Sequence, residues 1–112
     1  MESDKKIGAA MVVGSGIAGI QASLDLANSG IKVYLVEKEI SVGGVMAQLD
    51  KVFPTNDCSA CILSPKLVEV GRHPNVEILT RRRVLSLTGE PGHFQARPKK
   101  EPRYVDLSKC TG

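Results

Sequence analysis

Two short apolar runs, separated by a helical pattern, dominate the first third of the chain. Residues 7–13 and 31–36 are apolar almost throughout, without the alternation of a half-buried strand, as is typical of strands in a parallel sheet. Between them, apolar side chains recur at helical spacing, at Ile17, Ile20, Leu24 and Ala27. Gly30 follows as the residue expected just past the C-terminus of that helix. The pattern therefore predicts a strand, a helix and a second, parallel strand.

The middle of the chain predicts a second helix and a third strand. Residues 45–53 are ambiguous, residues 54–57 have the composition of a turn, and Ser64-Pro65 is a typical N-cap followed by the first helical residue. We expect this helix to end near Gly71-Arg72 and to bury its apolar residues, Leu67, Val68 and Val70. Residues 76–80 predict the third strand.

The last third of the chain predicts an antiparallel hairpin and a linker. Residues 84–87 and 93–96 flank a four-residue loop over 89–92, and residues 98–112 are basic and interrupted by proline. The expected organisation is a disordered tail over 1–6, an incomplete dinucleotide-binding domain over 7–97 and a linker over 98–112. The fold class is α/β, a partial Rossmann-like domain followed by a hairpin.

Composition excludes several classes of function. With 112 residues, 42% of them hydrophobic, the chain holds one small domain at most. Its formal net charge of +3 is too mild to indicate a nucleic-acid partner. No apolar run is long enough to span a membrane, and the first residues lack the apolar core of a signal peptide. We expect a cytoplasmic protein.

Three glycines after the first strand carry the clearest chemical signal. Gly14, Gly16 and Gly19 are spaced G-x-G-x-x-G, and Glu37 ends the second apolar run. In a dinucleotide site, the first glycine permits a tight turn, the second lets the backbone approach a pyrophosphate, and the third lets helix and strand pack closely. The acid accepts hydrogen bonds from a ribose, and its charge argues against a 2′-phosphate. An ordinary strand-to-helix turn would leave the position of Glu37 to coincidence.

Two other motifs have competing interpretations. Gly43-Gly44 is either a flexible linker or a second close approach of backbone to cofactor, and its place just past Glu37 favours the second. Arg81-Arg82-Arg83 is either an anion site or a charged strand edge that blocks unwanted pairing. We favour the strand edge.

The cysteines allow several kinds of chemistry. Cys58 and Cys61 form a C-x-x-C motif, which suits two iron–sulfur ligands, a redox-active disulfide beside a flavin, half of a zinc site, or two thiols without chemistry. The motif alone does not decide among these. Cys110, followed by Thr-Gly, has the form of the first cysteine of an interrupted C-x-x-C and would open a cysteine-rich insert.

At this point the sequence resembles a known family. Residues 12–22 and Val36-Glu37-Lys38 are similar to the flavin-binding start of glutathione-reductase-like flavoproteins. More narrowly, residues 43–51, 53–63 and 65–75 resemble the A subunit of heterodisulfide reductase. The resemblance covers nearly the whole chain after the tail, although family members are much longer.

The resemblance implies the FAD-binding portion of an iron–sulfur electron-transfer subunit in a soluble complex. In methanogens that complex reduces the heterodisulfide of coenzymes M and B, and related bacterial complexes bifurcate electrons. The implied cofactors are FAD and, in the full-length protein, a 4Fe-4S cluster. The implied partners are other heterodisulfide-reductase-like subunits and an electron-donating hydrogenase or dehydrogenase module, with no nucleic acid and no insertion into a membrane. The chain by itself is expected to be inactive.

The resemblance also assigns residues by matching position. The pyrophosphate would lie at the glycine turn, formed by Gly14, Ser15, Gly16, Ile17, Ala18 and Gly19. The ribose would lie at Glu37 and Lys38, and the adenine at the backbone of Val84. The flavin would lie near Gly43, Gly44, Val45 and Met46. An incomplete set of cluster ligands would comprise Cys58, Cys61 and Cys110.

Two alternatives remain open. One is a non-catalytic nucleotide-binding or interaction module whose cysteines are structural or bind zinc. The other is a flavin–dithiol reductase in which Cys58 and Cys61 are the catalytic pair.

Overall fold

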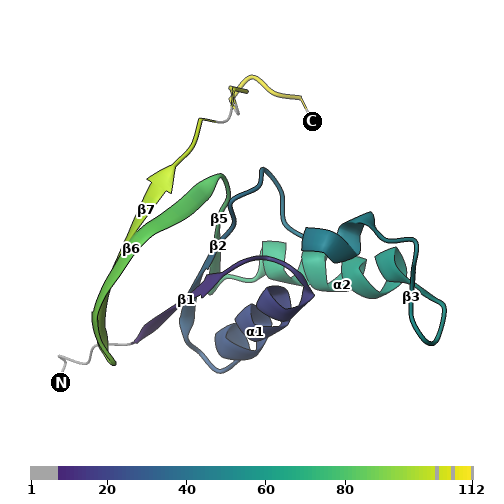
Figure 1. The fold of residues 1–112 in the computed structure, drawn as a ribbon, viewed down its shortest axis with the longest axis horizontal. Helices are drawn as coiled ribbons and strands as arrows, with labels where there is room; N and C mark the ends of the chain where they lie inside the picture. The colour runs from purple at the N-terminus through teal and green to yellow at the C-terminus, as the bar shows by residue number, and fades with distance from the viewer. Residues whose placement is uncertain (1–7, 103, 107, 112) are drawn as a thin grey trace.

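A three-stranded parallel sheet forms the centre of the protein. The computed structural model describes residues 8–102, 104–106 and 108–111, so the expected tail over 1–6 lies outside the described residues. Strands β1 (Ala9–Val13), β2 (Lys32–Val36) and β5 (Val76–Leu79) pair in parallel in the order β1-β2-β5 (Figure 1). The predicted α/β class and all three parallel strands are confirmed.

Helix α1 (Ile17–Asn28) connects the first two strands. Its buried apolar side chains, Ile20, Leu24 and Ala27, lie on the predicted stripe, and the polar Ser23 is buried as well. The helix ends as expected at Gly30, which has a φ of 92° and donates its N–H to Ala27 O over 3.0 Å. A left-handed residue at this position satisfies carbonyls that the helix leaves unpaired.

Helix α2 (Ser59–Arg72) begins six residues earlier than the sequence predicts. Cys58, not Ser64, is the N-cap, and Pro65 lies inside the helix. Ser59 fixes the early start, because its N–H donates to Asp50 O over 3.1 Å and its hydroxyl donates to Leu49 O. The predicted N-cap at Ser64 is therefore wrong, and tertiary hydrogen bonds outweigh the preference of proline for a first turn. The predicted helix end at Arg72 is confirmed.

One face of α2 completes the hydrophobic core. Leu63 and Val70 are buried, and Leu67 packs against the same cluster. Val68 is 52% exposed, so its predicted burial is wrong. Residues 63, 67 and 70 follow the i, i+4, i+7 spacing of one helix face, whereas residue 68 lies about 100° further round. The core cluster comprises Ile20, Leu24, Leu35, Leu63 and Val70.

The ambiguous stretch after β2 contains a short 3-10 helix and a small hairpin. The 3-10 helix η1 spans Gly44–Gln48, and β3 (Lys51–Val52) pairs antiparallel with β4 (Asp57–Cys58). The turn between them has Asn56 in the left-handed region at φ 61°, with its N–H bonded to Val52 O over 2.8 Å. The predicted turn chemistry is confirmed at this point of the chain.

A long antiparallel hairpin lies on the side of the sheet opposite the helices (Figure 1). It comprises β6 (Arg82–Glu90) and β7 (His93–Lys100). Because Glu90 pairs directly with His93, the loop has two residues, and the four-residue loop predicted from the sequence is wrong. Strand β7 also continues into the first three residues of the expected linker.

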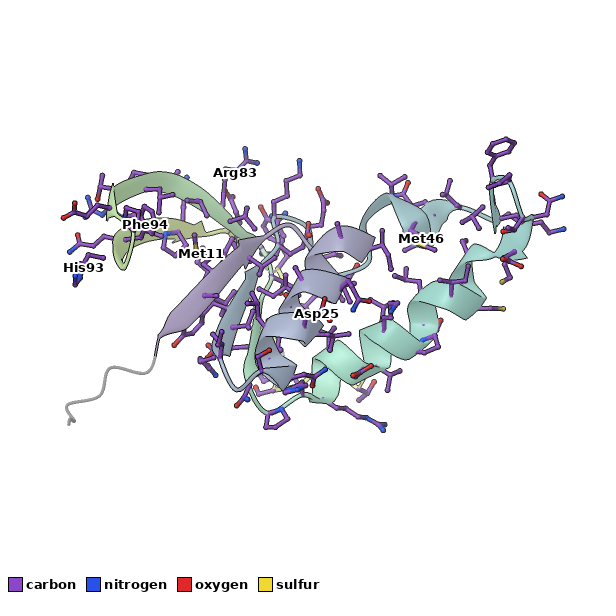
Figure 2. The ribbon with its side chains drawn as sticks, turned by 90° about the horizontal axis from the view of Figure 1, so that it is seen from below. Met11, Asp25, Met46, Arg83, His93 and Phe94 are labelled. Atoms are coloured by element: carbon purple, nitrogen blue, oxygen red, sulfur yellow. The ribbon has the colours of Figure 1, made fainter. Side chains whose placement is uncertain are left out.

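An apolar hollow separates this hairpin from the sheet. Its wall includes Met11 and Tyr34 from the sheet and Leu87 and Phe94 from the hairpin; Met11 and Phe94 are labelled in Figure 2. Within the part of the chain that the structure describes, no helix is long and apolar enough to cross a bilayer.

Candidate dinucleotide-binding site

The carboxyl ends of the three parallel strands meet at one edge of the sheet. Hydrogen bonds join these ends: Gly14 N donates to Val36 O over 2.8 Å, and Glu37 N donates to Leu79 O over 2.9 Å. The carbonyl of Glu37 in turn accepts from Arg82 N over 3.0 Å, at the start of β6. In open α/β sheets, ligands bind at this edge.

The geometry of the glycine turn agrees with the roles predicted for Gly14 and Gly19, and it leaves space for the role predicted for Gly16. Gly14 has a φ of 101°, which other residues rarely adopt. A Cβ at Gly19 would lie 1.9 Å from the carbonyl oxygen of Gly14, so only glycine lets helix and strand approach this closely. A Cβ at Gly16 would meet nothing within 4 Å, which leaves open space where the backbone would meet a pyrophosphate.

The N-terminus of α1 offers unpaired donors to an anion. Its N-cap is Gly16, and no side chain caps the helix. The first hydrogen bond within the helix runs from Ile20 N to Gly16 O over 2.9 Å, so the preceding amides of Ile17, Ala18 and Gly19 have no partner within the helix. These N–H groups and the positive end of the helix dipole fit a diphosphate.

Glu37 is held in place by the glycine turn itself. The carboxylate is only 7% exposed, and its Oε1 accepts from the amide of Ser15 over 2.8 Å and from the Ser15 hydroxyl. Its Oε2 accepts from Glu39 N over 3.0 Å. A carboxylate offers about four acceptor positions, so a position on Oε2 remains for a ribose hydroxyl.

These hydrogen bonds also keep Glu37 ionised. Burial raises the pKa of the carboxyl, but the hydrogen bonds from Ser15 and Glu39 and the nearby charge of Lys38 together outweigh it. The pKa of Glu37 therefore lies below its usual range. The side chain is an acceptor at neutral pH, as the binding of a ribose diol requires.

Gly43 and Gly44 bring the loop after β2 against the glycine turn. Gly43 N donates to Ser15 O over 2.9 Å, and a Cβ at Gly44 would lie 2.8 Å from the Cα of Gly16. Both residues have positive φ, at 126° and 62°. The two glycines therefore allow the loop after β2 to pack closely against the backbone of the glycine turn. Their predicted contact with a cofactor stays a prediction.

Val45 and Met46, which follow this glycine pair, lie in different surroundings. Met46 packs against the hydrophobic core, whereas Val45 is 71% exposed and lines a second hollow beside Glu37 and Lys38. Their predicted approach to the flavin stays a prediction. Val84, predicted to meet the adenine, lies with the glycine turn in one hollow of about 440 Å³.

That hollow also contains residues that the sequence did not assign to a site. Its wall is formed by Val13, Gly14, Ser15, Gly16, Val36, Glu37, Lys38, Arg82, Arg83 and Val84. The run of arginines directly before Val84 was the available signal for Arg82 and Arg83. The sequence favours a strand edge for this run because charged edges block unwanted pairing. It does not show that β6 starts beside Glu37.

Cys58 and Cys61 lie on the first turn of α2, and both are exposed. The amide of Cys61 donates to Cys58 Sγ over 3.3 Å. Hydrogen bonding from the Cys61 side chain, and then from its backbone, lowers the pKa of Cys58, and the same side-chain interaction raises the pKa of Cys61. This asymmetry suits a nucleophilic thiolate with a neighbouring thiol, and the pair also suits two ligands of a larger site.

Cys110 lies in a different part of the molecule. It is exposed in the C-terminal segment, where its N–H donates to Asp106 O over 3.0 Å, and Figure 1 shows that end of the chain apart from β3. Across the described ranges, no three His, Cys, Asp or Glu residues are grouped so as to hold a metal ion. The three cysteines predicted as cluster ligands are thus not assembled into one site.

The fold and the hollow at the sheet edge define a dinucleotide-binding domain of the Rossmann-like class. Residues 10–58 match the family model described as FAD dependent oxidoreductase. Among solved structures, L-proline dehydrogenase from P. horikoshii is similar, with a TM-score of 0.68 and 25% identity over 84% of this chain and 19% of that one.

Curated relatives narrow the class to one family. The chain is 57% identical over 103 residues to the second iron-sulfur A subunit of CoB--CoM heterodisulfide reductase from Methanopyrus kandleri. It is 54% identical over 103 residues to the A subunit of H(2):CoB-CoM heterodisulfide,ferredoxin reductase from Methanothermobacter marburgensis. Both alignments cover 92% of this chain and 16% of the relative. The chain belongs to the family of heterodisulfide reductase A subunits, and it spans about one sixth of the length of these relatives.

Proposed function

We propose that this chain is the FAD-binding portion of an electron-transfer subunit that works as the A subunit of heterodisulfide reductase does. The observation that carries the proposal is the hydrogen bond from Ser15 N to Glu37 Oε1, 2.8 Å long. This bond supports the proposal because the acid that would bind the ribose lies beside the turn that would bind the pyrophosphate. The names of the relatives supply the class of reaction, a disulfide reduction coupled to iron–sulfur electron transfer.

Each part of the hollow has a role in holding the cofactor. The amides at the start of α1 would bind the pyrophosphate, and Glu37 would bind the adenosine ribose. The backbone of Val84 would contact the adenine, while Gly44 to Met46 would lie toward the flavin. FAD would supply the conversion between two-electron and one-electron transfer.

The remainder of the proposed site depends on residues beyond this chain. Cys58, Cys61 and Cys110 would each ligate iron–sulfur clusters together with further thiolates, and residues 98–112 would lead toward a cysteine-rich insert. The partners would be the other subunits of a heterodisulfide reductase and a hydrogenase or dehydrogenase module. The names of the relatives support such an assembly, and we place it in the cytoplasm.

Titration with FAD tests the proposed function. The unchanged chain should bind FAD, and Gly16→Val should weaken binding roughly 100-fold, because its side chain occupies the place of the pyrophosphate and removes charge-assisted hydrogen bonds. Gly16 has an extended backbone and open space around a Cβ, so the variant should keep its fold.

Gly71→Val is the matched control. It lies on α2, again with nothing within 4 Å of an added Cβ, and should bind FAD as the unchanged chain does. Circular dichroism would establish that both variants are folded. Equal affinity of the Gly16 and Gly71 variants for FAD would contradict the proposal.

The Cys58–Cys61 hydrogen bond favours a second candidate, a flavin–dithiol reductase. In that reaction the two thiols lose two electrons and two protons to FAD and form a disulfide. Partial reduction of the FAD-loaded protein would then produce a thiolate-to-flavin charge-transfer band. An anaerobic preparation with iron and no such band would support cluster ligation instead.

A further inference from the structure

We propose that Lys38, Arg82 and Arg83 form a cationic wall of the adenosine hollow and bind the negative charge of the ADP moiety. The inference deepens the proposed function and rests on it. It assigns a binding role to two residues of the arginine run that the sequence alone attributed to a strand edge.

The topology separates these arginines from the first member of the run. Arg82 and Arg83 line the hollow with Gly14 and Glu37, and Arg82 N is bonded to Glu37 O over 3.0 Å. The guanidinium of Arg81 donates instead to Pro102 O over 3.3 Å. Figure 2 shows Arg83 projecting from the hairpin ribbon. The run is therefore divided between the hollow and the C-terminal segment.

Like charges surround the two arginines. Across the hairpin, Arg82 pairs with Lys100 and Arg83 pairs with Lys99. Like charges directly opposite each other destabilise an antiparallel pair. An anion bound beside either pair would reduce the repulsion within that pair.

Within the described residues, no ion pair joins a carboxylate to Arg82 or Arg83. The ion pair found there joins Lys32 and Glu77 on the strands of the sheet, at 3.7 Å, and neither Arg82 nor Arg83 takes part in a side-chain hydrogen bond with another described residue. Glu37, the acid in the hollow, accepts hydrogen bonds from Ser15 and from Glu39 N, and from neither arginine side chain. A diphosphate at the N-terminus of α1 is the anion that the neighbouring donors already fit.

Binding of ADP and of adenosine, measured by calorimetry and by NMR titration, tests the assignment. The variant carries Arg82→Gln and Arg83→Gln, which keep the aliphatic stems and the backbone N–H to Glu37 O. The control carries Arg72→Gln and Arg97→Gln, two exposed arginines outside this hollow. Both variants lower the formal net charge of +3 by two, so they share any effect of overall charge.

At low salt the Arg82/Arg83 variant should bind ADP roughly tenfold or more weakly, since each lost cation removes an attraction to a nearby anion. Its affinity for uncharged adenosine should stay unchanged, and its affinity for ADP should depend less on salt. Lys38→Gln should act in the same direction, and the control should match the unchanged chain.

Three outcomes would overturn the inference. Unchanged ADP binding by the Arg82/Arg83 variant would leave the arginines as a strand edge. Equal loss for ADP and adenosine would show an effect on the fold or the base. Failure of the unchanged chain to bind ADP or FAD would overturn the proposed function, and this assignment with it.

Discussion

Ser15 and Glu37, separated by 22 positions in the sequence, form a buried pair at the edge of the sheet. The amide of Ser15 lies 2.8 Å from Glu37 Oε1, and its hydroxyl donates to the same oxygen. Ser15 occupies a variable position of the glycine motif, yet here it orients the acid. The turn that would bind the pyrophosphate and the acid that would bind the ribose are thus one rigid unit.

The pairing with Ser15 should make stability depend on Glu37 in acid. Because the pKa of Glu37 in the folded state lies below its ordinary value of 4.5, its contribution is complete above that value and is lost as the pH falls toward the lower folded-state pKa. Glu37→Gln should therefore flatten the fall in unfolding free energy below about pH 4.5. Urea denaturation at several pH values would measure this, with exposed Glu69→Gln as the control; parallel curves for the Glu37 variant and the unchanged chain would contradict it.

Gly19→Ala should destabilise the fold without any ligand present. The added Cβ would lie 1.9 Å from Gly14 O, so strand and helix must separate, at a cost of about 3 kcal/mol or more. Gly71→Ala adds the same methyl group in open space on α2 and should stabilise by at most about 1 kcal/mol. Thermal or urea unfolding would compare the two, and similar midpoints for both variants would speak against this packing.

Two valines on α2 should respond differently to truncation. Val70 is fully buried in the core, whereas Val68 is 52% exposed. Val70→Ala should lower the free energy of unfolding by about 2 kcal/mol. Val68→Ala should change it by no more than about 0.5 kcal/mol. Urea unfolding measures both; a larger loss for Val68 would mean that α2 is rotated from the position described.

Cys58 should be the more reactive member of the C-x-x-C pair. Hydrogen bonds from Cys61 lower the pKa of Cys58, while the pKa of Cys61 is raised, so at neutral pH the thiolate forms first on Cys58. Iodoacetamide labelling followed by mass spectrometry should show Cys58 modified before Cys61. Cys61→Ala should slow the labelling of Cys58, and an unchanged rate would exclude the side-chain hydrogen bond as the cause.

The hydrophobic pattern was sufficient to predict the parallel strands, because short continuous apolar runs on either side of the helical stripe from Ile17 to Ala27 are typical of one βαβ unit. The start of α2 was not predictable in the same way. It depends on the contact of Ser59 with Leu49 and Asp50, which lie across the small β3–β4 hairpin. Local preferences at Ser64-Pro65 cannot report such a contact.

The same difference between local and long-range interactions applies to the candidate site. The glycine spacing and Glu37 were predictable because their chemistry is local to one βαβ unit. The place of Arg82 and Arg83 on the wall of the hollow was not predictable, because it depends on the bond from Arg82 N to Glu37 O, a contact between distant parts of the chain.

The bond from Gly43 N to Ser15 O, 2.9 Å long, has a consequence for cooperativity. The loop after β2 rests on the same residue that holds Glu37, so opening the loop would loosen the acid and the turn together. A ligand that orders the turn would then also protect the Gly43 amide from hydrogen exchange, because that N–H donates to Ser15 O. Exchange at the Gly43 amide would therefore report whether a ligand is bound, because the loop after β2 and the glycine turn would open as one unit.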